Sequence, residues 1–456
     1  MRGKVYRVSG GVTAAQGFEA AAAAAGIKYH GRTDMALICS DSPCTAAGVF
    51  TSNVVKAAPV LWNRKIVRES EEKVHAVVVN SGIANACTGE EGLQVCEETA
   101  EAAAKTLGIP VRSVLIGSTG VIGMQIPMER IRAGIDCLAA SKSASIEAGE
   151  AASKAIMTTD TVNKQAAVQI VMPGRGGMGA DAAADGKDAG DACGCCADGE
   201  GGSAAGGPDA GDSAVDGVTV TIGGMAKGSG MIHPGMCTML AYVTTDAAIS
   251  KALLQKAVSE IADDTFNMIS VDGDMSTNDT LLVLANGAAG NAEITSQESA
   301  AYAAFRVGLF TVCRTLAMAM AGDGEGATRL IESQVIHMDT TANAKVLAKS
   351  VIQSNLTKAA VFGRDANWGR ILCALGYAGV SFDPDKVELF FEANGRRIVI
   401  FAGGRAADYS EEEASDLLSK EKVTIISDMN MGEASATAWG CDLTYDYVRI
   451  NADYRS

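Results

Sequence analysis

The sequence predicts a layered α/β fold, on three observations. Strand-like and helical segments alternate along the 456 residues, apolar residues make up 48% of the chain, and short glycine-rich turns such as 117–123 and 223–230 separate the segments. A chain of this length and composition can bury a large core. Long helices placed between strands pack as layers on a sheet, so α/β packing is expected.

The individual elements are predicted from hydrophobic periodicity. Runs rich in β-branched residues, such as the alternation of Val218, Val220 and Ile222, predict strands. The predicted strands are His75–Asn80, Val218–Ile222, Thr280–Ala285, Val387–Glu392, Arg397–Phe401 and Val423–Ser427. A period of about 3.6 residues predicts helices at Pro127–Met157, Asp246–Asp263, Gln297–Ala321 and Ala342–Val361.

The charge distribution excludes some classes of partner. The formal net charge is −16, and residues 174–217 alone hold nine Asp or Glu against Arg175 and Lys187. This segment is mostly Gly, Ala, Asp and Ser without an aromatic residue, so we expect a flexible acidic insertion. No nucleic-acid partner is expected, because phosphate binding requires clustered Lys and Arg. No membrane partner is expected either, since no apolar run approaches about 18 residues.

The 12 cysteines do not form the pattern of a disulfide framework. Most stand singly in apolar surroundings (Cys39, Cys96, Cys137, Cys313 and Cys373), which predicts buried thiols and a cytoplasmic protein. Cys193, Cys195 and Cys196 cluster in the insertion and suggest a metal or redox patch. No second Cys pair or nearby His completes a zinc site, so we predict no metal and interpret these thiols as incidental.

Several cofactor motifs are missing. The sequence contains no G-x-x-x-x-G-K-[ST], no G-x-G-x-x-G between strand and helix, no H-E-x-x-H, and only four His residues. These absences weaken kinase, hydride-transfer and metallohydrolase interpretations. We therefore predict a reaction that requires no nucleotide and no redox cofactor.

Two glycine-rich stretches contain groups suited to acyl chemistry. Gly117-Ser-Thr-Gly120 follows the apolar run that starts at Val114, and there a hydroxyl and a backbone N–H could form an oxyanion hole or simply a helix cap. Lys227 to Thr238 combines a Lys, His233, Cys237 and a Thr in a turn before a strand. Cys237 with His233 as base is one hypothesis, but Pro234 and Gly235 disfavour the helix that would pair them.

The stretch Lys227-Gly-Ser-Gly-Met-Ile-His-Pro-Gly-Met-Cys-Thr238 resembles the self-cleavage region of the ornithine acetyltransferase family of arginine biosynthesis. The resemblance extends over nearly the whole chain. Further matching motifs are Asn80–Gly89, Ser118–Gly123, Met157–Thr161, Ser270–Asp274, Ser276–Asp279, Gly322–Arg329, Asp365–Arg370, Ala436–Tyr447 and Asn451–Ser456. The departures are the 174–217 insertion, Cys237 where the family commonly has Ala, and Ile83 and Met275 where it has Asn and Thr.

The resemblance implies a catalytic role for a threonine. Proteins similar to this chain cleave themselves before that residue, here between Cys237 and Thr238, and Thr238 then begins a second chain. Its new α-amine, with a reference pKa of about 7.7–8.0, would act as the general base for its own hydroxyl. By the same resemblance, Thr119 and the N–H of Gly120 would form the oxyanion hole.

The resemblance also implies the substrates and the assembly. The acetyl donor would be N-acetylornithine and the acceptor glutamate, with substrate contacts from Thr159, Lys227, Thr238, Glu325, Asn451 and Ser456. Thr158 competes with Thr159 for this role. The implied fold has stacked mixed sheets covered by helices, as in self-processed proteins with an N-terminal Thr nucleophile of the DmpA-like kind. Chains 1–237 and 238–456 would form an α2β2 heterotetramer without a cofactor, and acetyl-CoA as a second acetyl donor stays open.

Two other functions stay open on the residues. A self-processed amidohydrolase or aminopeptidase of related architecture would admit water to the acyl-enzyme and release acetate without glutamate. A non-enzymatic protein that binds metal or a partner through the acidic, cysteine-bearing insertion would keep its function after Thr238→Ala.

Overall fold

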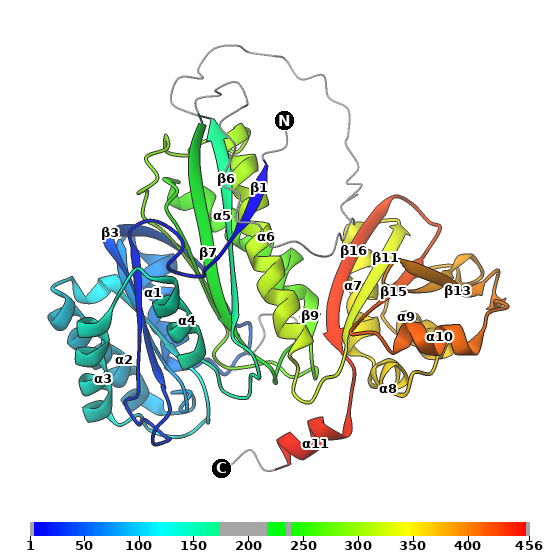
Figure 1. The fold of residues 1–456 in the computed structure, drawn as a ribbon, viewed down its shortest axis with the longest axis horizontal. Helices are drawn as coiled ribbons and strands as arrows, with labels where there is room; N and C mark the ends of the chain where they lie inside the picture. The colour runs from blue at the N-terminus through cyan, green and yellow to red at the C-terminus, as the bar shows by residue number, and fades with distance from the viewer. Residues whose placement is uncertain (1–3, 174–216, 234–238, 453–456) are drawn as a thin grey trace.

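A computed structural model describes residues 4–173, 217–233 and 239–452 of the chain. Within these residues two mixed β-sheets are flanked by helices, which confirms the predicted α/β fold. The predicted insertion lies outside the described residues, except for Gly217, which already belongs to strand β7 (Gly217–Lys227). Figure 1 shows one sheet at each side, with helix α6 between them.

The first sheet has nine strands in the described part of the chain, in the order β1-β6-β7-β8-β10-β3-β4-β5, with β2 paired to β3. Strand β3 organises it: its first half pairs with β2 and β4, and its second half, from Thr45 to Phe50, pairs with β10. The strands are β1 Val5–Val8, β2 Phe18–Ala23, β3 Met35–Phe50, β4 Val74–Asn80, β5 Val114–Ser118, β6 Lys164–Pro173, β7 Gly217–Lys227, β8 Leu240–Thr245 and β10 Thr280–Ala285.

The second sheet has seven strands among the described residues, in the order β14-β13-β12-β15-β11-β16-β9. They are β9 Ile269–Ser270, β11 Leu330–Met338, β12 Glu388–Ala393, β13 Arg396–Ala402, β14 Arg405–Ala406, β15 Lys422–Asp428 and β16 Ala434–Cys441. Each strand predicted from the sequence coincides with an observed strand to within a few residues, because β-branched runs bounded by turns are a strong local signal.

The helices cover both sheets (Figure 1). They are α1 Ala58–Glu69, α2 Gly89–Leu107, α3 Met128–Ser141, α4 Ile146–Ala155, α5 Lys251–Asp264, α6 Ala300–Gly322, α7 Thr341–Gln353, α8 Asn355–Gly363, α9 Trp368–Gly376, α10 Glu411–Leu418 and α11 Tyr445–Asn451. Helix α6 contacts β6 and β7 of the first sheet and β11 and β16 of the second. Among the described helices it is long and apolar enough to cross a membrane, but half of its most apolar window is buried, as in a core helix.

Three predicted helices need correction. Pro127–Met157 is two helices, because Ser143 exchanges backbone hydrogen bonds with Ala20 of β2 and Ser145 caps α4 by accepting the N–H of Ala148 at 3.1 Å. Ala342–Val361 is likewise divided at Ser354, whose extended backbone ends α7 and whose hydroxyl caps α8. The predicted start of the third, Asp246, is not helical: its carboxylate accepts backbone N–H groups before α5 begins.

The cysteine prediction is correct in part. No disulfide joins the cysteines that the structure describes, and Cys39, Cys96 and Cys313 are buried as expected. Cys137 and Cys373, however, are exposed, so the expectation that they pack as core residues was wrong. Both lie on amphipathic helices, α3 and α9, where apolar neighbours in sequence do not place a residue on the buried face.

Candidate active site

A cavity of about 220 Å³ gathers most of the residues that the sequence singled out; we call it the main cavity. Its walls come from segments far apart in the chain. Lining residues are Ala84, Thr119, Gly120, Val121, Ile122, Thr158, Thr159, Lys227, Gly230, Met231, Ser276, Thr277, Asn278, Glu325 and Asn451. Thus Thr119, Gly120, Thr159, Lys227, Glu325 and Asn451 lie around one space, together with Thr158.

Strand ends and helix ends bring these side chains together. Thr119 and Gly120 follow β5, Lys227 is the last residue of β7, and Asn451 is the last residue of α11. Residues 158–159 follow α4, and Glu325 lies in the turn after α6. Polar groups at element ends keep free hydrogen-bonding capacity while the packed core beneath holds their backbone in place.

The backbone at Thr119 and Gly120 has the close packing expected of a rigid turn. The N–H of Thr119 donates to the carbonyl of Asn80 at 3.0 Å. Gly120 has a φ of +129°, and a Cβ there would lie 2.3 Å from the carbonyl carbon of Gly82. Only glycine fits such an approach, so the chain conformation of this wall is tightly constrained.

Lys227 is fully buried, and its ammonium faces hydroxyl groups. Its Nζ donates to Thr158 Oγ1 at 2.7 Å and to Thr119 Oγ1 at 3.1 Å. Burial lowers the pKa of Lys227, although the nearby Asp160 carboxylate acts in the opposite direction. Thr158, and not Thr159, therefore contacts this lysine, while both threonines line the cavity.

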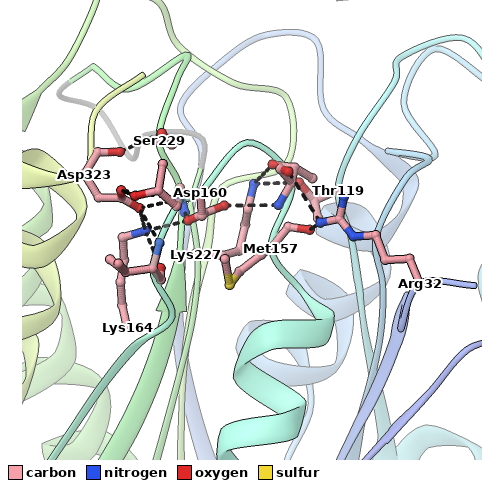
Figure 2. A network of polar contacts seen from close by, with 12 residues as sticks. Arg32, Thr119, Met157, Asp160, Lys164, Lys227, Ser229 and Asp323 are labelled. Carbon is pink, nitrogen blue, oxygen red and sulfur yellow. Dashed lines mark hydrogen bonds and ion pairs between the residues drawn. The ribbon is translucent and has the colours of Figure 1, made fainter. Parts of the chain in front are cut away.

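Behind the main cavity lies a buried cluster of ion pairs that sequence reasoning missed (Figure 2). Lys164 Nζ lies 2.6 Å from Asp160 Oδ1 and 2.5 Å from Asp323 Oδ2. Asp160 also accepts the N–H of Gly228 at 2.7 Å. Burial alone would raise the pKa of Asp160, but the Lys227 and Lys164 charges and these hydrogen bonds hold it at about 2. Both aspartates stand in motifs that carried the resemblance, yet nothing in the sequence pairs them with Lys164.

A carboxylate and an amide form another wall of the main cavity. Asn451 Nδ2 donates to Glu325 Oε2 at 2.7 Å, and the Glu325 N–H donates to the Ser229 carbonyl at 2.9 Å. Glu325 is buried, and a Cβ at Gly230 would lie 2.3 Å from Glu325 Oε2. The glycine therefore makes room for a buried carboxylate that faces the cavity.

The predicted nucleophile Thr238, its neighbour Cys237 and the predicted contact Ser456 lie outside the described residues. The residue after Thr238, Met239, donates its N–H to Asp279 Oδ1 at 3.1 Å. Asp279 directly follows the cavity residues Ser276, Thr277 and Asn278. Burial raises the pKa of Asp279 well above its ordinary value, and its Oδ2 has no hydrogen-bond partner within the described residues. His233 is also partly buried, and this burial lowers its pKa.

A glycine-constrained turn with a threonine hydroxyl, a buried lysine and a buried carboxylate line one cavity of an α/β fold, an arrangement typical of enzyme active sites. The model of the ArgJ family matches residues 19–188 and 210–456, so the chain belongs to the ArgJ family. The gap between the two matched ranges, residues 189–209, falls inside the predicted insertion. The family and the biosynthetic enzyme class predicted from the motifs are thereby confirmed.

Two relatives with matching sequences agree with this assignment. The arginine biosynthesis bifunctional protein ArgJ of Symbiobacterium thermophilum is 47% identical over 98% of this chain and 99% of its own length. The ArgJ protein of Thermotoga neapolitana is 43% identical over 93% of this chain and 95% of its own length. Among solved structures, ArgJ from Bacillus halodurans is 44% identical, with a TM-score of 0.45 over 46% of this chain and 97% of that chain.

Proposed function

We propose that the protein transfers the acetyl group of N2-acetyl-L-ornithine to L-glutamate through an acetyl ester on Thr238. The observation that carries this proposal is the main cavity, where the oxyanion candidates Thr119 and Gly120, the buried Lys227 and the carboxylate of Glu325 line one space. Membership in the ArgJ family, with relatives named arginine biosynthesis bifunctional proteins, supports the same substrate class.

The first step makes the nucleophile. Cleavage between Cys237 and Thr238 frees an α-amine beside the Thr238 hydroxyl, and an amine of this kind has a pKa of about 7.7–8.0, close to working pH. The amine takes the hydroxyl proton as Oγ attacks the acetyl carbonyl. Thr119 and the Gly120 N–H would stabilise the negative oxygen of the tetrahedral intermediate.

The second step exchanges the amines. The leaving α-amine of ornithine takes the proton, ornithine departs, and the α-amine of glutamate attacks the Thr238 ester to give N-acetylglutamate and the free hydroxyl. One amide is broken and one amide is made, so no nucleotide is required. If acetyl-CoA is an additional donor, it would acetylate the Thr238 hydroxyl and so form the same ester.

Two buried charges in the main cavity suit the donor. Lys227 would bind the α-carboxylate, because its ammonium faces hydroxyls and keeps capacity for an anion. Glu325 would bind the side-chain ammonium of ornithine, with Asn451 holding the carboxylate in place. Thr159 and Ser456 complete the proposed substrate contacts.

The two chains would share the first sheet after cleavage. Strand β7, before the cut, pairs with β8 after it, and β10, after the cut, pairs with β3 from the first part of the chain. Residues 1–237 and 238–456 would therefore stay together as one folded unit. The α2β2 assembly and the cytoplasmic location belong to the same proposal and require a mass measurement in solution and localisation in cells.

Intact mass spectrometry of the protein and of Thr238→Ala tests the proposal. We expect two fragments divided between Cys237 and Thr238, an uncut variant, and no acetyl transfer by that variant. Cys237→Ala serves as the control, since it keeps the Thr238 nucleophile and should still be cut. An uncut but active wild-type protein would contradict the mechanism. Acetate release at an undiminished rate without glutamate would instead indicate an amidohydrolase.

A further inference from the structure

A second cavity of about 250 Å³ adjoins the main cavity; we call it the Arg32 cavity. The two share a wall formed by Gly120, Val121, Thr158 and Thr159. The oxyanion candidate Gly120 thus lines both spaces. A substrate whose reacting amine lies at this wall can extend its other end into either cavity.

The charge of the Arg32 cavity is positive. Arg32 is the one charged residue among its described lining residues. One terminal nitrogen of its guanidinium donates to the carbonyls of Met157 and Thr158, as Figure 2 shows for Met157. Its other two nitrogens have no hydrogen bond within the described residues. A guanidinium has five N–H donors, so capacity remains for a carboxylate.

A second cation reinforces this charge. The ring of Tyr29, which lines the cavity, has the Lys28 ammonium 4.8 Å from its centroid and the Arg32 guanidinium 6.0 Å from it. Lys28 Nζ is buried without a hydrogen-bond partner in the described part of the chain. A buried ammonium that has an aromatic ring but no hydrogen-bond partner keeps part of its desolvation cost, and an anion bound nearby would offset this cost.

Unlike the positive Arg32 cavity, the main cavity favours a substrate with a positively charged side chain. Glu325 suits the ammonium of ornithine, but the same carboxylate would repel the side-chain carboxylate of glutamate at short range. The two substrates of the proposed reaction share their α-amino acid group and differ at the side-chain end. A site with Glu325 alone would therefore favour the donor and reject the acceptor.

We propose that the Arg32 cavity is the subsite for the side-chain carboxylate of the acetyl acceptor, with Arg32 as its main ligand and Lys28 as a supporting charge. This inference rests on the proposed function, in which glutamate is the acceptor. The two cavities would then separate the substrates by charge: the donor extends toward Glu325 and the acceptor toward Arg32, and both place their amine at the shared wall.

The test separates the two half-reactions. Acetylation by N-acetylornithine is followed as ornithine release and as the mass of the acetylated chain that begins at Thr238. Deacetylation is followed with glutamate and, separately, with glutamine, which lacks the negative charge. For Arg32→Gln we expect a roughly 10- to 100-fold higher KM for glutamate, the range for losing a charge-assisted hydrogen bond. The preference for glutamate over glutamine should fall by the same factor, and acetylation should change little.

Three further variants complete the design. Arg32→Lys keeps the charge and should recover part of the preference for glutamate. Glu325→Gln should show the reverse pattern: the KM for N-acetylornithine should rise, and the KM for glutamate should not. Arg132→Gln removes an exposed arginine of α3 that pairs with Glu98, so it should leave both half-reactions unchanged.

Two outcomes would overturn the inference alone. In the first, Arg32→Gln keeps the preference for glutamate over glutamine. In the second, it slows acetylation and deacetylation equally, as expected if Arg32 only positions Thr158. If the wild-type protein forms no acetyl ester with N-acetylornithine, the proposed function fails and this inference fails with it.

Discussion

Two buried lysines lie close together in this fold and have different surroundings. Lys164 contacts two carboxylates, those of Asp160 and Asp323, and all three side chains are almost completely buried. Lys227 is buried as completely, but the hydrogen bonds of its ammonium go to the hydroxyls of Thr119 and Thr158. Lys164 therefore has two direct carboxylate partners, whereas Lys227 has none among the described residues and acts on Asp160 only through its charge.

The difference separates a structural role from a binding role. A buried cation paired with two carboxylates has its desolvation cost offset inside the protein, so it contributes to folding but has little capacity for a ligand. A buried cation whose direct contacts are hydroxyls keeps much of its attraction for an anion, because Asp160 acts on Lys227 only through its charge and not as a direct partner. Burial lowers the pKa of Lys227, because its charged form is incompletely compensated inside the protein. Stability and binding should therefore respond to different lysines.

The largest expected effect is the loss of activity in Lys227→Met. Removing one partner of a buried charge contact with a substrate typically costs about 2–5 kcal/mol, so kcat/KM should fall by roughly 30- to 4,000-fold. The stability should fall less than in Lys164→Met. Steady-state kinetics with N-acetylornithine and urea unfolding measure the two quantities. An unchanged kcat/KM would contradict the proposed role of Lys227 in substrate binding.

Lys164→Met should show the reverse pattern, with its main effect on stability. The substitution leaves Asp160 and Asp323 buried without their cation, which typically costs about 3–5 kcal/mol of unfolding free energy. Lys154→Met is the matched control, because Lys154 forms an exposed pair with Glu150 on α4 and should change stability by less than about 0.5 kcal/mol. Equal stabilities of the two variants in urea would contradict the comparison.

Acid pH should weaken the same cluster without any mutation. The pKa of Asp160 is about 2 in the folded protein against an ordinary 3.8. A carboxyl with a lowered folded pKa stabilises the fold above its unfolded pKa, and this contribution disappears as pH falls from about 4 through 2. The difference amounts to roughly 2 kcal/mol. Urea unfolding between pH 5 and 2 should show this loss, and Asp160→Asn should have a flatter profile over the same range.

The smallest effect is expected at Asp279, a buried carboxyl whose pKa burial raises well above its ordinary value. Asp279→Asn keeps an oxygen that accepts the Met239 N–H, so its stability near the ordinary carboxyl pKa, at about pH 4, should match the wild type within about 1 kcal/mol. Since the folded wild type holds a proton that it loses as pH rises, the variant should become the more stable of the two at higher pH. Thermal unfolding at several pH values would reveal this crossing, and parallel curves would exclude a raised pKa.

The sequence predicted the fold and several of the residues that line the main cavity, because both have local signals. The strands and helix α6 follow from hydrophobic periodicity, and Thr119, Gly120, Lys227, Glu325 and Asn451 stand in motifs with a known family pattern. The break at Ser143 depended on a contact with Ala20, more than a hundred residues away, which periodicity does not report. Arg32 and the pair of Lys164 with Asp323 were missed for the same reason, since the residues of each contact are more than a hundred positions apart.

The strand order of the first sheet has a consequence for how the protein would fold before cleavage and refold after it. Strands β8 and β10 lie between β7 and β3. Cleavage between Cys237 and Thr238 would thus convert a fold completed by one chain into a fold that two chains must complete together. The precursor would refold with first-order kinetics, whereas the cleaved form would refold in a second-order reaction whose half-time lengthens on dilution. Processing would then make folding effectively irreversible, because the fold forms in the single-chain precursor and re-forms less readily once the chain is cut.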